Sequence, residues 1–224
     1  MIRADTDKPL EPALPRATLP LLLLGAFLAL GLAVAPDPPG RFDRWAERML
    51  MQQDSDRLAR VMQLVTDLGS DRIAAPLMVA VLGWVIWRHG GRLAISIGVI
   101  WGGAKLSCTV AKALFDRERP LVSQLAGLGD HYSYPSGHTV TAVITYGLIA
   151  ALLVRHRRGW GRWLPIALAA VIALAVAVSR VYLGRHYATD VIGGLLLGAA
   201  WLSAGIPWLN NVEADPAAPQ REVR

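Results

Sequence analysis

Apolar residues along this chain gather into six long stretches, and short polar segments separate them. A helix that crosses a bilayer needs roughly 20 mainly apolar residues, with a range of about 17–25. Several stretches are slightly short, so flanking residues must complete them. The six are Leu19–Ala35, Ile73–Trp87, Leu93–Leu114, Thr139–Val154, Trp163–Val178 and Val191–Leu209. The pattern predicts an all-α, polytopic membrane protein built as a bundle of six transmembrane helices.

The first stretch also has features of a signal peptide. Basic residues precede it, and the small residues Ala33-Val34-Ala35 follow its core. Its apolar part is longer than the usual signal core, and Pro36 directly follows the cleavage-like sequence. We therefore expect an uncleaved first span.

The chain length suits one domain. We expect a cytoplasmic N-terminal tail at residues 1–17, one membrane-embedded domain at 18–209 and a disordered C-terminal tail at 210–224, which is rich in Ala, Pro and charge. Residues 36–72 form the longest polar connection and are expected to lie at the membrane interface. The sequence leaves the oligomeric state open.

Two short helices are predicted within that connection. One follows Ser55, a suitable N-cap, and the other lies just before it. The apolar residues at helical spacing are Leu58, Val61, Met62 and Val65 in the former and Phe42, Trp45 and Met49 in the latter. Such helices either lie in the interface or pack against the bundle, and the pattern does not separate these alternatives.

Composition agrees with a membrane protein and disfavours other classes. Hydrophobic residues make up 54% of the chain and charged residues 18%, and the charges lie between the apolar stretches. The net charge is +6, but no basic run alternates with aromatic residues as in a nucleic-acid groove, so no nucleic-acid partner is expected. Tryptophans are expected at the membrane interfaces. The single Cys108 excludes an internal disulfide and a thiolate metal cage.

Basic residues near the span ends indicate the orientation. Residues 88–92 and 155–162 contain arginine and no acid, which is typical of cytoplasmic loops. The total number of Lys and Arg is the same on both sides, but the opposite side carries more acidic residues. We expect both termini in the cytoplasm.

Three polar clusters stand at the edges of the apolar stretches. They are Lys112-(six residues)-Arg119-Pro120, Pro135-Ser136-Gly137-His138, and Ser179-Arg180-(five residues)-His186-(three residues)-Asp190. With six alternating spans, the end of the third, the start of the fourth, the end of the fifth and the start of the sixth lie on one membrane face. The clusters are therefore expected to meet in one pocket, opposite the arginine-rich loops.

The residue types in these clusters suit a phosphate. Ser136 is expected to cap a helix, and Gly137 lets the backbone approach an anion at the helix N-terminus. Lys112, Arg119 and Arg180 would bind a phosphoryl group, the arginines through bidentate hydrogen bonds. These side chains form the expected anion site.

Two histidines and one carboxylate complete the clusters. His186 and Asp190 are four residues apart, which places them on one face of a helix, so that the carboxylate orients the imidazole. An oriented imidazole can attack phosphorus while a second histidine, His138, protonates the departing oxygen. We therefore predict phosphate cleavage.

These motifs resemble those of the type 2 phosphatidic acid phosphatase (PAP2) superfamily, whose pattern is K-x6-RP, PSGH and SR-x5-H-x3-D. The resemblance covers residues 93–202 well and extends to the first 70 residues only in hydropathy. It implies a PAP2-like core, His186 as nucleophile forming a phosphohistidine, Asp190 as its orienting group and His138 as general acid. It also implies that Lys112, Arg119, Ser136, Gly137 and Arg180 bind phosphate, with no metal and no cofactor. Tyr134, where Phe is common, and Ala188, where Pro is common, depart from the pattern.

The expected function is that of a membrane lipid phosphatase in the bacterial inner membrane, with its active site facing the periplasm. Members that the chain resembles act on a phospholipid or polyprenyl phosphate: phosphatidic acid, phosphatidylglycerol phosphate, undecaprenyl diphosphate or lipid A phosphates. Alternatives are a lipid A phosphatase or phosphotransferase, a vanadate-dependent haloperoxidase and an inactive scaffold. The sequence does not choose the lipid.

Four further polar residues lie near the motifs. Lys105 lies two turns deeper than Lys112, and it either extends the cationic site or pairs with a buried polar group. Arg117 and Arg185 are expected to face solvent or the interface. His131 is expected to be a loop residue without a direct role.

Overall fold

The described part of the chain is helical. The computed structural model describes residues 17–35, 38–51, 55–125, 132–155, 157 and 159–214, and within them the only β-type pairing is an isolated bridge between Glu118 and Tyr132. The helices are α1 (Thr18–Val34), α2 (Arg41–Met51), α3 (Asp56–Asp67), α4 (Asp71–His89), α5 (Gly91–Phe115), α6 (Leu121–Leu125), α7 (Gly137–Val154), the 3-10 helix η1 (Trp160–Arg162), α8 (Trp163–Tyr182) and α9 (Ala188–Ala214). The predicted all-α class is confirmed.

Among the described residues, five helical segments are long and apolar enough to cross a membrane. They are Asp56–His89, Gly91–Phe115, Gly137–Val154, Trp160–Tyr182 and Ala188–Val212. α1 is apolar but has only 17 residues, which is the lower limit for a span. The sixth span therefore stays a prediction.

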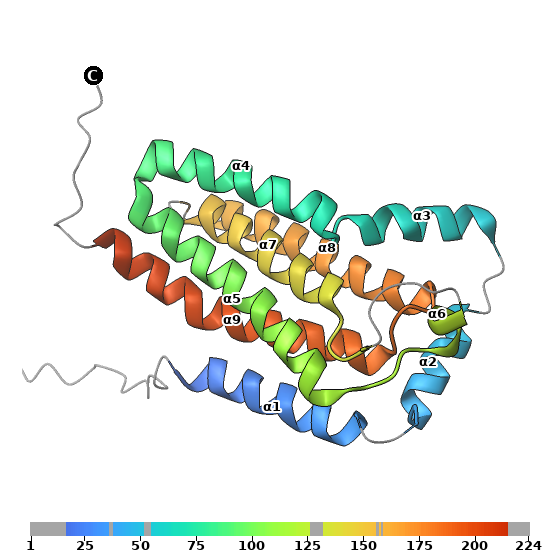
Figure 1. The fold of residues 1–224 in the computed structure, drawn as a ribbon. Coiled ribbons are helices and arrows are strands. Elements are labelled where there is room, and N and C mark those ends of the chain that lie inside the picture. Colours follow the sequence, from blue (N-terminus) through green and yellow to red (C-terminus); the bar gives the residue numbers. More distant parts are fainter. Residues whose placement is uncertain are drawn as a thin grey trace, which may run out of the picture.

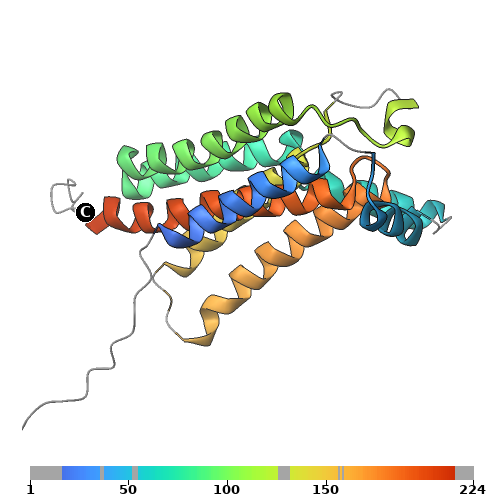
Figure 2. The same ribbon diagram turned by 90° about the horizontal axis from the view of Figure 1, so that it is seen from below.

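The bundle is organised around α5, α7 and α9. α4 packs on α5 and α7, α8 packs on α7, and α1 lies along α9 (Figures 1 and 2). The core lies where these helices meet, and its fully buried side chains include Ile97, Ile100, Ile144, Leu148 and Leu197. Residues from five separate parts of the chain thus share one apolar core.

Two glycines near the start of α9 allow the turn before α7 to press against that helix. A Cβ at Gly194 would lie 2.9 Å from the carbonyl oxygen of Ser136, and one at Gly193 would lie 2.4 Å from the ring of Tyr134. Real Cβ atoms do not approach backbone oxygen this closely. Glycine at both positions therefore fixes the Ser136 turn beside the first turns of α9.

Tyr134 attaches α1 to this arrangement. Its hydroxyl donates a hydrogen bond of 2.6 Å to the carbonyl of Phe27, and its ring stacks on Phe27 at a centroid distance of 5.4 Å. Phe115, at the end of α5, meets the same ring edge-on at 5.1 Å. The hydroxyl that distinguishes Tyr134 from the more common phenylalanine thus forms a hydrogen bond between the turn before α7 and helix α1.

The long connection between the first two apolar stretches divides into two helices with different environments. α3 packs on α8 through Val65 and Leu68, and it continues into α4 after a short turn. α2 lies across the ends of the long helices, while α3 extends roughly along their direction (Figures 1 and 2). Phe42 and Trp45 on α2 stay exposed. Both helices therefore pack against the bundle, α2 through Ala46 and Leu50, and α2 also keeps an exposed apolar face.

The last helix is longer than expected. α9 runs to Ala214 without a break at Pro207, so residues 210–214, which we assigned to a disordered tail, are helical. Once a helix has formed, each residue added at its end gains one hydrogen bond, so extension is easier than initiation. The polar residues at this end are readily hydrated beyond the end of the span. Residues 215–224 and the first 16 residues lie outside the described part.

Replacing Tyr134 with phenylalanine tests the link between α1 and the bundle. Tyr134→Phe removes one buried hydrogen bond and keeps the ring, so we expect a loss of about 0.5–1.5 kcal/mol in unfolding free energy. Reversible unfolding of the detergent-solubilised protein measures it. Tyr132→Phe, at a partly exposed tyrosine, is the control and should change stability by less than about 0.5 kcal/mol. Equal effects of the two substitutions would contradict the assignment.

Candidate active site

The three motifs meet at one end of the bundle, where α5 and α8 end and α7 and α9 begin (Figure 1). His138 lies within electrostatic range of His186 and of the side chains of Lys112, Arg119 and Arg180. A Cβ added at Gly137 would lie 4.0 Å from Cε of Lys112. The convergence that span counting predicts is therefore observed.

The Ser136 turn opens α7, as predicted, but not by side-chain capping. Ser136 occupies the N-cap position with extended backbone angles, and its side chain makes no capping hydrogen bond. Its Oγ accepts from Oγ1 of Thr139 at 3.0 Å, and its backbone N–H donates to the carbonyl of Asp190 at 3.0 Å. The turn is therefore held by the adjacent helix α9, and the serine side chain leaves the first amides of α7 available to an anion.

Two arginines of the motifs are almost completely buried beside this turn. Arg119 donates to the carbonyl of Arg185 at 3.2 Å, and Arg180 donates to Oγ1 of Thr66 at 3.1 Å. Nε of Arg180 is buried and has no hydrogen-bond partner among the described residues. A buried guanidinium N–H without a partner is costly unless an acceptor reaches it, which fits an anion-binding role.

His186 lies in the loop between α8 and α9, and not on a helix as its spacing from Asp190 predicted. α9 begins at Ala188, so Asp190 belongs to the first turn of the helix and His186 precedes it. Nδ1 of His186 nevertheless lies 3.4 Å from Oδ2 of Asp190, a long contact of the kind that tightens when substrate binds. The helical expectation was wrong, but the pairing of the two side chains is observed.

Asp190 is fully buried, and three groups besides His186 contact its carboxylate. The hydroxyl of Ser133 and the backbone N–H of Tyr187, at 2.8 Å, donate to Oδ2. The guanidinium of Arg117 donates to Oδ1 at 2.5 Å. A buried carboxylate needs this number of donors to remain charged, so the side chain that faces His186 is held firmly in place.

Arg117 was expected to face solvent or the interface, and that expectation was wrong. Only 3% of its surface is exposed, and its guanidinium bridges Asp190 and Asp43, the latter at 2.7 Å. Burial lowers the pKa of Arg117, but attraction to Asp190 and Asp43 outweighs burial, so the pKa is raised overall. Arg117 is therefore a permanent cation beside the carboxylate of Asp190. Arg185, by contrast, stays partly exposed.

Asp43 comes from α2, and sequence reasoning missed it. Its carboxylate accepts hydrogen bonds from Arg117 and from both the backbone N–H (2.9 Å) and the hydroxyl (2.8 Å) of Thr189. Ala46 and Leu50, three and seven residues later, share the face of α2 that packs against α8 and α9. The sequence does contain one sign of this role: Asp43 shares a helical face with the apolar residues Ala46 and Leu50, and an acidic residue in such a position needs a buried partner.

The turn between α3 and α4 forms another wall of the site. A Cβ at Gly69 would lie 2.7 Å from the carbonyl oxygen of His138, and Tyr146 donates a hydrogen bond of 3.0 Å to the carbonyl of Leu68. Together with the contact between Thr66 and Arg180, this turn supports His138 from the side. The segment at 36–72 thus shapes the pocket as well as lying at its edge.

Lys105 is paired with protein groups. Its ammonium contacts the carboxylate of Asp71 and the hydroxyl of Thr141, the latter at 3.3 Å, and lies 5.3 Å from the centroid of the Trp101 ring. These contacts favour the alternative in which Lys105 pairs with a polar group of the bundle. His131 lies outside the described residues.

The electrostatic surroundings of His186 favour its neutral form. Burial lowers the pKa of its imidazole to about 4; Asp190 raises it, and Arg180 and Arg119 lower it further. The imidazole is then uncharged at neutral pH, with Nδ1 turned towards Asp190 and Nε2 left as the second nitrogen. A neutral, oriented imidazole is a competent nucleophile.

Comparison with known proteins relates this arrangement to one family. The model of the PAP2 superfamily matches residues 93–213. Phosphatidylglycerophosphatase B of Bacillus subtilis (strain 168) is 30% identical over 181 residues, which is 80% of this chain and 89% of that protein. An undecaprenyl-diphosphatase of Sulfolobus acidocaldarius is 40% identical over 92 residues, which is 41% of this chain and 38% of that protein.

A solved structure has the same fold. It is the crystal structure of a transmembrane PAP2-type phosphatidylglycerolphosphate phosphatase from Bacillus subtilis, which superposes with a TM-score of 0.74 at 29% identity. The match covers 86% of this chain and 96% of that structure. The resemblance therefore extends beyond the three motifs to most of the bundle.

The protonation state of His186 can be measured directly. We expect its imidazole to titrate at about pH 4 in the folded protein, because burial disfavours the cation. Since this folded pKa lies below the ordinary value, the corresponding stability is present above about pH 6.5 and is lost as the pH falls towards 4. Nuclear magnetic resonance of histidine-labelled protein reads the titration, and His186→Gln assigns the signal. A midpoint near 6.5 would contradict this electrostatic description.

Arg117 and Arg185 form a natural pair for testing burial. Arg117→Gln leaves two buried carboxylates without their cation, so we expect a loss of about 3–5 kcal/mol in unfolding free energy. Arg185→Gln should cost less than about 0.5 kcal/mol, since its side chain is partly exposed. Chemical unfolding of both variants in one detergent provides the comparison. A small effect of Arg117→Gln would show that the bridge contributes little.

Proposed function

This chain belongs to the PAP2 superfamily and is a membrane lipid phosphatase, and we propose that it cleaves its lipid phosphate through a phosphohistidine on His186. The observation that carries the proposal is the position of His186. Its Nδ1 lies 3.4 Å from the buried carboxylate of Asp190, and Arg119 and Arg180 are close enough to act on its imidazole electrostatically. This arrangement supplies an oriented nucleophile and cations for an anion site.

In the first step, the lone pair on Nε2 of His186 attacks phosphorus and forms a P–N bond. The bond between phosphorus and the lipid-side oxygen breaks, and His138 gives that oxygen a proton. Asp190 stabilises the positive charge that develops on the imidazole of His186. The two products are a free lipid alcohol, or a lipid monophosphate where the substrate is a diphosphate, and phosphohistidine.

The second step reverses these roles with water. His138, now neutral, accepts a proton from a water molecule whose oxygen attacks the phosphohistidine. The P–N bond breaks, inorganic phosphate leaves and His186 returns to its neutral form. Both proton transfers are then balanced over one catalytic cycle.

We assign the phosphate oxygens to cationic and backbone donors. Arg119, Arg180 and Lys112 neutralise the negative charge, and the backbone at Ser136 and Gly137 supplies N–H groups at the N-terminus of α7. These same cations lie within electrostatic range of His138. A bound phosphoryl dianion would offset their charge and favour the protonated form that donates to the leaving group.

Phosphatidylglycerophosphate is the first substrate we propose, because the relative named for that activity matches most of this chain. Undecaprenyl diphosphate is the second, since another relative named for it is 40% identical over 92 residues. Both lipids present a phosphate at the membrane surface. The position of the site at one end of the bundle suits either one.

We further propose that the active site faces the periplasm from the bacterial inner membrane, with both termini in the cytoplasm. The support is the arginine content of two loops, residues 88–92 and 155–162. These loops join α4 to α5 and α7 to α8 at the end of the bundle opposite the site. Reaction with a membrane-impermeant thiol reagent, after single cysteines are placed at the loops, reads this topology.

Phosphate release from a panel of lipid phosphates tests the reaction. We expect hydrolysis of phosphatidylglycerophosphate, undecaprenyl diphosphate or both, unaffected by EDTA and inhibited by vanadate, which mimics the transition state at phosphorus. His186→Ala should lower kcat by more than about a thousandfold, since it removes the nucleophile. His89→Ala is the control and should keep activity, because His89 is an exposed histidine at the end of α4 that is far from the site. Full activity of His186→Ala would overturn the proposed mechanism.

A further inference from the structure

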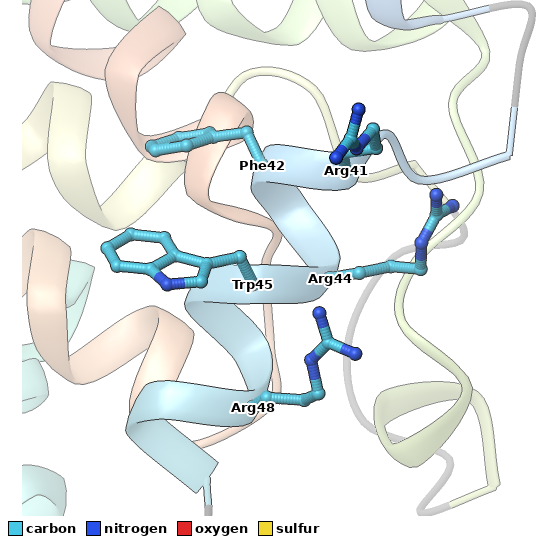
Figure 3. A pocket seen from close by; sticks show the side chains of 5 residues that line it. All are labelled: Arg41, Phe42, Arg44, Trp45 and Arg48. Atoms are coloured by element: carbon cyan, nitrogen blue, oxygen red, sulfur yellow. The ribbon is translucent and has the colours of Figure 1, made fainter.

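The exposed side of α2 carries two rows of side chains that the proposed reaction does not use. Arg41, Arg44 and Arg48 follow one another at helical spacing and are exposed, as are Phe42 and Trp45. The five line a shallow hollow of about 590 Å³. Figure 3 shows the three arginines on one side of the helix and the two aromatic rings on the other.

A third face of α2, which is buried against the bundle, fixes the directions in which the arginine and aromatic rows point. Asp43 and Ala46 are buried, and Leu50 packs against residues of α8 and α9. At 3.6 residues per turn, the arginine row points about 160° away from this buried face, and the aromatic row lies roughly 100° from each of them. The arginines therefore point away from the protein, and the rings point to one side.

Within the described part of the chain, no acid pairs with the arginine row. None of the three guanidinium groups forms an ion pair with a carboxylate of the residues that the structure describes. Arg44 donates a hydrogen bond to the carbonyl of Pro39, which leaves its charge in place. Three exposed cations on successive turns, without a carboxylate partner among the described residues, form a surface that attracts anions.

The aromatic row shows which kind of anion suits this surface. The rings of Phe42 and Trp45 stack at a centroid distance of 5.9 Å, and about half of each side chain is exposed. Exposed Trp and Phe beside a cationic row are typical of helices that lie in the membrane interface. Helix α2 lies across the ends of the spanning helices (Figure 1). In that position its rings would enter the bilayer surface while the arginines stay at headgroup level.

We propose that Arg41, Arg44 and Arg48 bind the headgroups of anionic phospholipids in the leaflet that borders the active site. The partner is a lipid phosphate, which the guanidinium groups hold through charge-assisted hydrogen bonds while the acyl chains contact Phe42 and Trp45. The surface adjoins the catalytic pocket, because Asp43 on the same helix contacts Arg117. Where the proposed function holds, this surface concentrates anionic substrate lipid beside His186.

The experiment uses the full chain in nanodiscs of phosphatidylcholine with a minority of phosphatidylglycerol. Electron paramagnetic resonance of spin-labelled phosphatidylglycerol measures the fraction of lipid immobilised by the protein. The variant Arg41→Gln/Arg44→Gln/Arg48→Gln should lower the preference for phosphatidylglycerol over phosphatidylcholine roughly tenfold or more, given about 1 kcal/mol per arginine near the surface. The control Arg57→Gln/Arg60→Gln/Arg72→Gln removes the same charge from exposed positions on α3 and α4 and should keep the preference.

Three outcomes would overturn the inference: an unchanged preference in the α2 variant, an equal loss in the control, or displacement of the lipid by excess inorganic phosphate, which would indicate a site for free anions. Thermal unfolding shows whether the α2 variant is folded, and the single variant Arg44→Gln replaces it if it is not. Turnover gives a separate readout, in which the α2 variant should raise KM for lipid substrate in vesicles and leave kcat unchanged. Lipid binding without any hydrolysis would count against the proposed function alone.

Discussion

The buried carboxylate of Asp190 is the constraint on which the rest of the site depends. A charge without solvent must be balanced and hydrogen-bonded, or the group becomes protonated. Arg117 supplies the positive charge, and Ser133 and Tyr187 supply further donors. Asp43 then engages the other side of Arg117, so two carboxylates share one guanidinium and leave one negative charge in excess. That excess faces His186.

Positive charge also acts on His186. Arg119 and Arg180 lower the pKa of its imidazole, while Asp190 raises it. Burial keeps the resting imidazole neutral. In the proposed mechanism, the carboxylate of Asp190 stabilises the cation that forms during attack, and Arg119 and Arg180 bind the phosphoryl group. A histidine is a reactive nucleophile when its surroundings stabilise the cation formed on attack more than the protonated resting imidazole.

Sequence reasoning reached the helices and the motif residues because both depend on local pattern. Spans follow from continuous apolar stretches, and counting them places Lys112, His138 and His186 at one end. Arg117 gave no such signal: its partners Asp43 and Asp190 are 74 and 73 residues away, and only tertiary packing brings them together. The spacing of His186 and Asp190 also misled, because four residues indicate a helical face, whereas here the chain bends before α9 begins.

The part of the chain outside the family match therefore does more than cover the site. The match begins at residue 93, yet Asp43 and Thr66, both earlier in the chain, contact Arg117 and Arg180 directly. Helix α2 binds this network through Asp43 on its inner face and presents its arginines on the outer one. Since a helix is rigid over three turns, a displacement of its outer face also moves Asp43, and through Arg117 it reaches the carboxylate that orients His186. In the proposed mechanism the motifs supply the phosphate chemistry, while the alignment of His186 depends on a helix exposed at the end of the bundle.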